Sequence, residues 1–213
     1  MPGMDFDTLS PADQIVEIGR NLWMKAMVAA NDGNISVRLD DSTVLCTPTG
    51  VSKGYLSADR LSTVTLDGKL LSGPRPSSEV KMHLRVYEED PDVRAVVHAH
   101  PLFSTALAVM GESLNTQMLP ETIVAMPWVP LAPYAPPSTE AVPESIAGFV
   151  RSTNACLLEH HGALTWAGDL MTAYLGMERL EATAKLHYHL RLVQGERFLP
   201  ESEVIRLQGI FGV

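Results

Sequence analysis

Apolar residues recur along the chain at two spacings, one typical of helices and one typical of strands. Residues 10–30 repeat apolar positions at helical spacing, behind Ser10 as a helix cap and Pro11 at the first helical position. Residues 168–195 predict a long amphipathic helix by the same periodicity. Three shorter helices are predicted over residues 76–90, whose start is marked by Ser77 or Ser78, over 101–110 and over 139–152.

Short β-branched runs between these segments predict a sheet. The predicted strands cover residues 35–39, 43–48, 94–100 and 155–167, and residues 62–72 predict a hairpin around Asp67 and Gly68. The stretch 49–61 reads as a loop, and the Pro-rich stretch 127–138 is flanked by strands. We therefore expect antiparallel strands covered by helices, in a single domain over residues 1–213.

Composition narrows the class of protein. The net charge is -9, with 16 Lys and Arg against 25 Asp and Glu, which argues against a nucleic-acid partner. No apolar stretch is long enough to span a membrane, and the acidic start "MPGMDFDTLS" does not read as an export signal. Cys46 and Cys156 lie in apolar strand-like stretches and predict reduced core thiols. Together these features predict a cytoplasmic protein.

Two histidines end the predicted strand in "VVHAHP". His98 and His100 are two positions apart, so they point to the same face of a strand, roughly 6.6 Å apart along the backbone. Imidazoles at that spacing can reach a common ion at about 2.0–2.1 Å. Taken alone, the pair fits a structural role as well as a metal site.

Further candidate ligands follow in "LLEHHGAL" and "PSSE". His160 and His161 are adjacent, so at most one of them should face a site built by the first pair, and the spacing does not choose between them. Glu79 supplies a carboxylate that could complete the site or stand beside it as a base. Three histidines with one exchangeable position are typical of catalytic zinc. His83 shares the helix face of Glu79 and is expected to pack beside the site. His187 and His189 are two positions apart on a predicted helix, so their side chains point in different directions, and both are expected at the surface.

Small and polar residues in three loops form a second candidate site, because free backbone N–H groups there can bind a phosphate. Each loop is weak evidence alone, since Gly, Ser and Thr are ordinary turn residues. Lys53 could add positive charge, but a solvated loop lysine is the expected reading. The residues of these predicted phosphate loops are Asn34, Thr49, Gly50, Ser77 and Ser78.

The motifs "GNIS", "TPTG", "PSSE", "VVHAHP" and "EHHG", in this order and spacing, resemble the class II aldolase/adducin family. The resemblance implies a three-layer α/β/α sandwich around a mainly antiparallel central sheet. It also implies a homotetramer with active sites at subunit interfaces, acting on a small sugar phosphate with zinc, or with Mn2+ or Co2+, as cofactor. Matched by position, the metal ligands are His98, His100 and His161, Glu79 is the acid/base residue, and the predicted phosphate loops bind the substrate phosphate.

One departure concerns a tyrosine that fuculose-phosphate aldolases contribute from a neighbouring subunit. The matching stretch here places Leu119 at that position, and no tyrosine follows Tyr188. Glu121 is the nearest ionisable replacement as a catalytic group, although a solvent-facing carboxylate is equally compatible with the sequence. An apolar pocket wall in place of the tyrosine favours short or deoxygenated aldehydes as substrates.

The reaction expected from the resemblance is reversible cleavage of a ketose 1-phosphate to dihydroxyacetone phosphate and an aldehyde. Two alternatives within the family are a sugar-phosphate 4-epimerase and a methylthioribulose-1-phosphate dehydratase. An alternative of another class is a non-catalytic adducin-like binding domain, against which the intact set of metal-binding residues argues. Fold alone does not decide among these functions.

Overall fold

The computed structural model describes residues 6–213 as helices packed on one eight-stranded sheet. The first five residues, which begin the acidic stretch that argues against an export signal, lie outside the described residues. The strands are β1 (Asn34–Arg38), β2 (Thr43–Cys46), β3 (Ser62–Thr65), β4 (Leu70–Ser72), β5 (Ala95–Ala99), β6 (Leu131–Ala132), β7 (Ala155–Leu158) and β8 (Gly162–Ala167). The α-helices are α1 (Pro11–Met24), α2 (Val80–Glu89), α3 (Leu102–Val109), α4 (Pro120–Ala125), α5 (Ala141–Ala147), α6 (Leu170–Leu192) and α7 (Glu201–Phe211). Short 3-10 turns cover Phe6–Thr8, Lys53–Tyr55 and Ala58–Arg60.

The sheet has the order β4-β3-β2-β1-β5-β8-β7-β6. It is a mixed sheet, because β6 runs parallel to β7 while the other neighbouring pairs run antiparallel. The expectation of a mainly antiparallel sheet is corrected to that extent. The parallel pair arises because β6 is separated from β7 by the α5 crossover, whereas hairpins and longer returns join the antiparallel strands.

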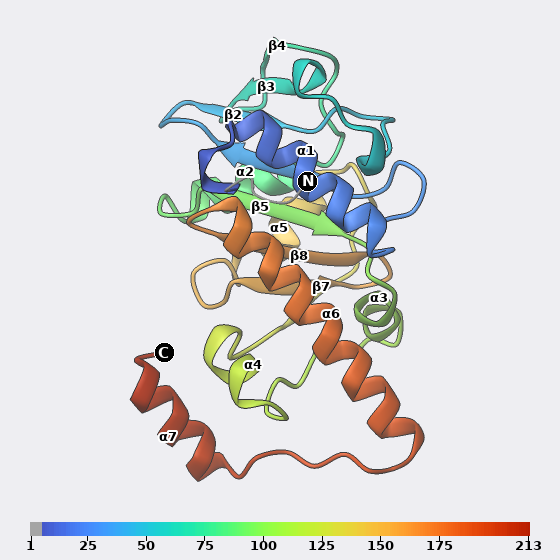
Figure 1. Cartoon of the computed structure of the whole chain (residues 1–213), viewed down its shortest axis with the longest axis vertical. Helices are drawn as coiled ribbons and strands as arrows, with labels where there is room; N and C mark the ends of the chain where they lie inside the picture. The colour runs from blue at the N-terminus through green and yellow to red at the C-terminus, as the bar shows by residue number, and fades with distance from the viewer. Residues whose placement is uncertain (1–5) are drawn as a thin grey trace.

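Helices cover both faces of the sheet, so the predicted three-layer α/β/α class is confirmed (Figure 1). Alternate residues of β5 show the division between the two faces. Ala95, Val97 and Ala99 pack in the core under α1 and α6, whereas Val96 packs in the core under α2 and α5. His98 belongs to the second face by the same alternation, and this places its side chain beside α2.

Most of the predicted elements are confirmed, with three corrections near the candidate site. The stretch predicted as one strand over 155–167 is a hairpin, in which β7 and β8 are joined by a turn at residues 159–161. Helix α2 begins at Val80 with Glu79 in the cap position, so neither Ser77 nor Ser78 is the cap. The Ser77 hydroxyl instead accepts a hydrogen bond from the Glu79 N–H at 3.3 Å. Lys53, expected in solvent, is buried.

Other sequence-based expectations have mixed outcomes. Cys46 and Cys156 are free and buried, as predicted. His189 is exposed as expected, but His187 is buried, and its Nδ1 lies 2.8 Å from a Glu196 oxygen. Over residues 6–213, none of the helices is long and apolar enough to cross a membrane.

Candidate active site

The C-terminal end of strand β5 brings the first two histidines, His98 and His100, into contact. In its antiparallel register His98 lies opposite Asn34 of β1 on one side and opposite Leu164 of β8 on the other. The strand ends at Ala99, and His100 follows with its backbone N–H bonded to the Met27 carbonyl oxygen. The chain is therefore held on both sides at this point, and the two imidazoles turn toward each other with their Nε2 atoms 3.0 Å apart.

The turn between β7 and β8 supplies the third histidine. His160 has a φ of 56°, a left-handed conformation that is unusual for a residue other than glycine, and it reverses the chain there. Its ring lies beside Tyr134, whereas the His161 ring lies 4.8 Å from the His98 ring and 5.0 Å from the His100 ring, centroid to centroid. The sequence predicted that only one of the pair joins the site. The turn, and not a strand alternation, decides which one.

The three histidines converge with one nitrogen each within 4.8 Å of the others. A tetrahedral zinc at about 2.0–2.1 Å from each nitrogen would separate the nitrogens by about 3.3 Å. The His98 and His100 Nε2 atoms, 3.0 Å apart, already lie near that separation. His98 Nδ1 lies 2.9 Å from the Ala163 carbonyl oxygen, which can only accept, so this nitrogen carries the proton. Its Nε2 lone pair then points into the cluster, as a metal ligand requires. The residues present therefore fit a metal ion.

Glu79 brings a carboxylate to the same cluster from the start of α2. One oxygen lies 3.0 Å from His161 Nε2, and the other lies 3.5 Å from His98 Nε2. The second oxygen also accepts a hydrogen bond from the Asn34 side-chain amide at 2.9 Å. Since an amide has two N–H groups, Asn34 holds Glu79 and keeps one donor for another partner.

Burial and mutual charge set the ionisation of these groups. Burial lowers the pKa of His98 well below its ordinary value, and burial lowers that of His100 as well. Burial alone would raise the pKa of Glu79, but the hydrogen bond from His161 and the charges of His98 and His161 hold it below its ordinary value. Burial disfavours the charged form of His98 and His100, and an ionised Glu79 carboxylate beside them favours a bound cation.

A cavity of about 340 Å3 opens in front of these residues, and we call it the histidine cavity. All five residues of the predicted phosphate loops line it, together with Glu79, His100 and His161. His98 lies behind the wall and is fully buried. Sequence reasoning overlooked Asp32, whose Oδ2 lies 3.7 Å from His100 Nδ1, although its place two residues before Asn34 could have indicated it. It also misjudged Lys53, which lines the cavity.

The chain does not bring Glu121 or Leu119 into the histidine cavity. Leu119 caps α4, and Glu121 lies exposed in its first turn, with its carbonyl oxygen bonded to Arg179. Helix α4 packs with α7 at the far end of the molecule (Figure 1). The predicted role of Glu121 depended on a neighbouring subunit, and it stays a prediction.

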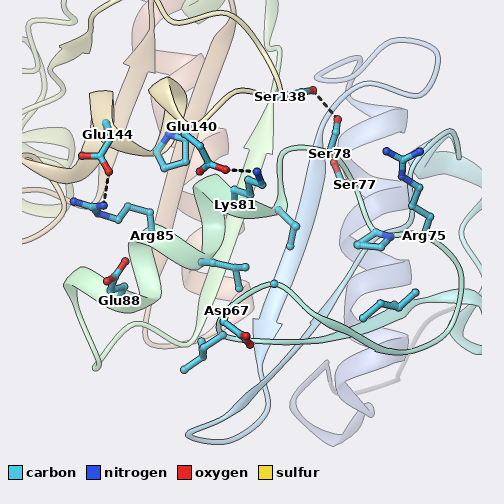
Figure 2. A pocket seen from close by; sticks show the side chains of 17 residues that line it. Asp67, Arg75, Ser77, Ser78, Lys81, Arg85, Glu88, Ser138, Glu140 and Glu144 are labelled. Atoms are coloured by element: carbon cyan, nitrogen blue, oxygen red, sulfur yellow. Dashed lines mark hydrogen bonds and ion pairs between the residues drawn. The ribbon is translucent and has the colours of Figure 1, made fainter.

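A larger cavity of about 690 Å3 adjoins the histidine cavity behind a hydrogen bond of 2.9 Å between the Ser78 and Ser138 hydroxyls (Figure 2). Two of its basic side chains already have acidic partners: Lys81 is paired with Glu140, which precedes α5, and Arg85 is paired with Glu144 of α5. It contains no histidine. The candidate site is therefore chosen by the convergent histidines and not by cavity volume.

Comparison with known proteins identifies the family. The model of the class II aldolase and adducin N-terminal domain matches residues 13–188. The chain is 35% identical over 206 residues to a 3-oxo-tetronate 4-phosphate decarboxylase of Haemophilus influenzae, covering 94% of this chain and 97% of that protein. It is 30% identical over 175 residues to an L-fuculose phosphate aldolase of Methanococcus maripaludis, covering 82% of this chain and 94% of that one.

Solved structures agree with this result. The YgbL structure from Klebsiella pneumoniae superposes with a TM-score of 0.87 at 35% identity, covering 96% of this chain and all of that one. An L-fuculose 1-phosphate aldolase structure superposes with a TM-score of 0.86 at 28% identity, covering 95% of this chain and 96% of that one. The fold, the convergent motifs and these matches lead to one conclusion: the chain belongs to the class II aldolase/adducin family.

Proposed function

We propose that this protein is a metal-dependent carbon–carbon lyase that cleaves a bond near the carbonyl group of a phosphorylated sugar. The observation that carries the proposal is the position of Glu79, whose carboxylate touches His161 and lies beside His98 at the wall of the histidine cavity. A carboxylate there can act on a substrate held at the same histidines. A binding domain without catalysis would not need that arrangement.

His98, His100 and His161 would hold the metal, with zinc first and Mn2+ or Co2+ as alternatives. A metal ion bound there would supply positive charge beside the substrate carbonyl oxygen. The predicted phosphate loops would bind the phosphate through backbone N–H groups and hydroxyls, and thereby orient the reacting end. A homotetramer with active sites at subunit interfaces and a cytoplasmic location remain predictions.

The first candidate reaction is aldol cleavage of a ketose 1-phosphate, with a fuculose-1-phosphate-like sugar or a deoxypentulose 1-phosphate as substrate. In such a sugar the carbonyl carbon is C2, the C2–C3 bond stays intact, and the C3–C4 bond breaks. The C4 hydroxyl loses its proton to a base, and C4 becomes the aldehyde carbon. The electron pair stays with C3, and Glu79 would deliver a proton to C3, which gives dihydroxyacetone phosphate.

Decarboxylation of a phosphorylated 3-oxo acid is the second candidate, and two observations favour it. The relative from Haemophilus influenzae, at 35% identity, is named for that reaction. Among the described residues, no tyrosine lines the histidine cavity. Loss of carbon dioxide needs no base to remove a hydroxyl proton, so a site with Glu79 as its main acid/base group suffices. The epimerase and dehydratase alternatives have no comparable support.

The experiment is to assay purified protein with three substrates: a ketose 1-phosphate, a phosphorylated 3-oxo acid and the dephosphorylated ketose. We expect one of the first two to be consumed, with aldehyde or carbon dioxide as the product. Glu79→Gln should lower kcat by about 100-fold or more with the fold retained, because it removes the proton-transferring group. Glu140→Gln, a change at an exposed carboxylate on the larger cavity, is the matched control.

Two results would contradict the proposal. One is full activity in Glu79→Gln, and the other is equal kcat/KM for the phosphorylated and dephosphorylated ketose, since phosphate binding should increase the rate as well as the affinity. If the aldol reaction is observed, assaying it in the direction of synthesis with a panel of aldehydes would identify the preferred aldehyde. It would also show whether Glu121→Gln has any effect, which is the test of its predicted catalytic role.

A further inference from the structure

A buried lysine on the wall of the histidine cavity is not explained by the family motifs. Lys53 has only 1% of its surface exposed, which is rare for a lysine without an acidic partner. Among the described residues, none of the carboxylates forms an ion pair with it. Its Nζ donates instead to two neutral acceptors, the Asn31 carbonyl oxygen at 2.8 Å and the Val51 carbonyl oxygen at 2.7 Å.

These two acceptors fix where the ammonium group lies. Asn31 precedes the segment that carries Asn34, and Val51 directly follows Thr49 and Gly50. The Lys53 ammonium therefore bridges two of the three predicted phosphate loops at the cavity wall. An ammonium has three N–H groups, and two are used by these carbonyl oxygens.

The backbone around Lys53 is held firmly, so its position is not that of a mobile side chain. Residues 53–55 form a 3-10 turn that packs on α1. A Cβ on Gly19 of α1 would lie 2.9 Å from the Lys53 carbonyl oxygen, so only glycine allows this close approach. The ammonium group is consequently presented at one place, without the large loss of side-chain entropy that a solvated lysine would undergo on binding.

We propose that Lys53 is the counter-charge for the substrate's phosphate group, which it binds through its remaining N–H. The inference rests on the proposed function, in which a phosphate occupies these loops. A buried ammonium group is costly when no anion contacts it directly, and a phosphate dianion in the cavity would lower that cost. The phosphate loops otherwise offer only neutral donors, so Lys53 determines that the ligand is an anion and not a neutral sugar.

The ionisation of Lys53 is compatible with this role. Burial lowers its pKa to about 8, while the charges of Asp32 and Glu79 act in the opposite direction. The side chain is therefore mostly protonated at neutral pH. Its cost of burial is largest in the absence of an anion.

The test uses inorganic phosphate as the probe and calorimetric titration of purified protein as the assay. Three variants separate charge from packing: Lys53→Arg keeps the charge, Lys53→Gln keeps N–H donors without the charge, and Lys53→Met removes both. We expect phosphate affinity to fall about 10- to 100-fold in Lys53→Gln and Lys53→Met, and to be largely kept in Lys53→Arg. Lys69→Gln, which removes an exposed lysine on the β3–β4 hairpin, is the control and should bind as wild type does.

Other outcomes would overturn the proposal. If Lys53 only joins two loops, thermal stability should fall in Lys53→Met, and the folded Lys53→Gln protein should bind phosphate as wild type does. If the wild-type protein does not bind phosphate, the proposal also fails. If phosphate affinity depends on the charge but neither candidate substrate is consumed, Lys53 remains an anion-binding residue and the proposed function is the part that is wrong.

Discussion

Acidification should destabilise this protein through His83, a histidine whose pKa is much lower in the folded state than in the unfolded state. His83 lies on α2 and is buried, with Nδ1 2.7 Å from the Ser36 hydroxyl. Within residues 6–213 its Nε2 has no hydrogen-bond partner. Burial lowers its pKa to about 3, with Glu79 opposing the shift. The unfolded chain, in which the pKa is about 6.5, therefore binds a proton between pH 6.5 and 3 that the folded chain does not.

The sign and size follow from this difference. Because the unfolded state binds more protons, the free energy of unfolding falls as the pH falls through 6.5, by about 2 kcal/mol at pH 5 and about 4 kcal/mol near pH 3. His83→Gln removes the titrating group and can still hydrogen-bond to Ser36. We expect wild type to lose about 2 kcal/mol more than this variant between pH 8 and pH 5.

The assay is urea denaturation at pH 8, 6.5 and 5 in the presence of a chelator, so that metal binding does not contribute. Comparing each protein with itself across pH cancels the general cost of the substitution. Comparing the pH-dependent change of wild type with that of the variant then cancels the titration of the groups that both share. His189→Gln, at an exposed position on α6, is the control and should follow wild type. An equal loss of stability in wild type and His83→Gln would refute the reasoning.

Three further predictions concern the metal site. His161→Ala should lose stoichiometric zinc while His160→Ala retains it, as elemental analysis of purified protein would show, and equal retention would contradict the assignment. Asp32→Asn should weaken zinc binding about 10- to 100-fold in a chelator competition, because its carboxylate lies 3.7 Å from His100 Nδ1 and can orient the ring, and unchanged affinity would exclude that role. Gly162→Ala should cost about 1–3 kcal/mol in urea denaturation and lower the zinc content, since a Cβ there would lie 2.6 Å from the His100 ring. A Cβ there would also lie 2.6 Å from the Ala99 carbonyl oxygen, so wild-type stability in that variant would contradict the prediction.

The sequence predicted the histidine pair well because two strong rules agree there. A β-branched run ended by His98 and His100 indicates a strand end, and period two places the side chains on one face. The structure confirms the strand and the convergence. The predicted phosphate loops came from turn chemistry together with the family resemblance, and their residues line one cavity, while phosphate binding there stays a prediction.

Residues 155–167 were harder to interpret, because both strands of the hairpin are buried. Two apolar runs flank the polar residues 159–161, and reading the whole stretch as one buried strand missed the reversal at His160. Lys53 was misjudged for a different reason. Its burial depends on carbonyl oxygens of Asn31 and Val51 that only the folded chain brings together, whereas the average lysine is solvated.

Helices α4 and α7 also escaped prediction. Helix α4 has only six residues and starts at a proline, so its periodicity is too short to read. Helix α7 exposes Ile205, Ile210 and Phe211, which blurs the contrast between an inner and an outer face.

The residues of the histidine cluster are far apart in the sequence, and this affects how metal binding is coupled to folding. Pairing of β5 with β1 and β8 fixes the position of His98. Its Nδ1 partner Ala163 is 65 residues away along the chain, and Glu79 is 45 residues from Asn34, which donates a hydrogen bond to it. Such separations carry a high loop-closure cost, so the unfolded chain does not hold the ligands together. A metal that binds only the assembled cluster then adds to the free energy of unfolding in proportion to the logarithm of its concentration. If the proposed metal binds, the thermal midpoint should report on metal supply, and a cell short of that metal would hold less folded protein.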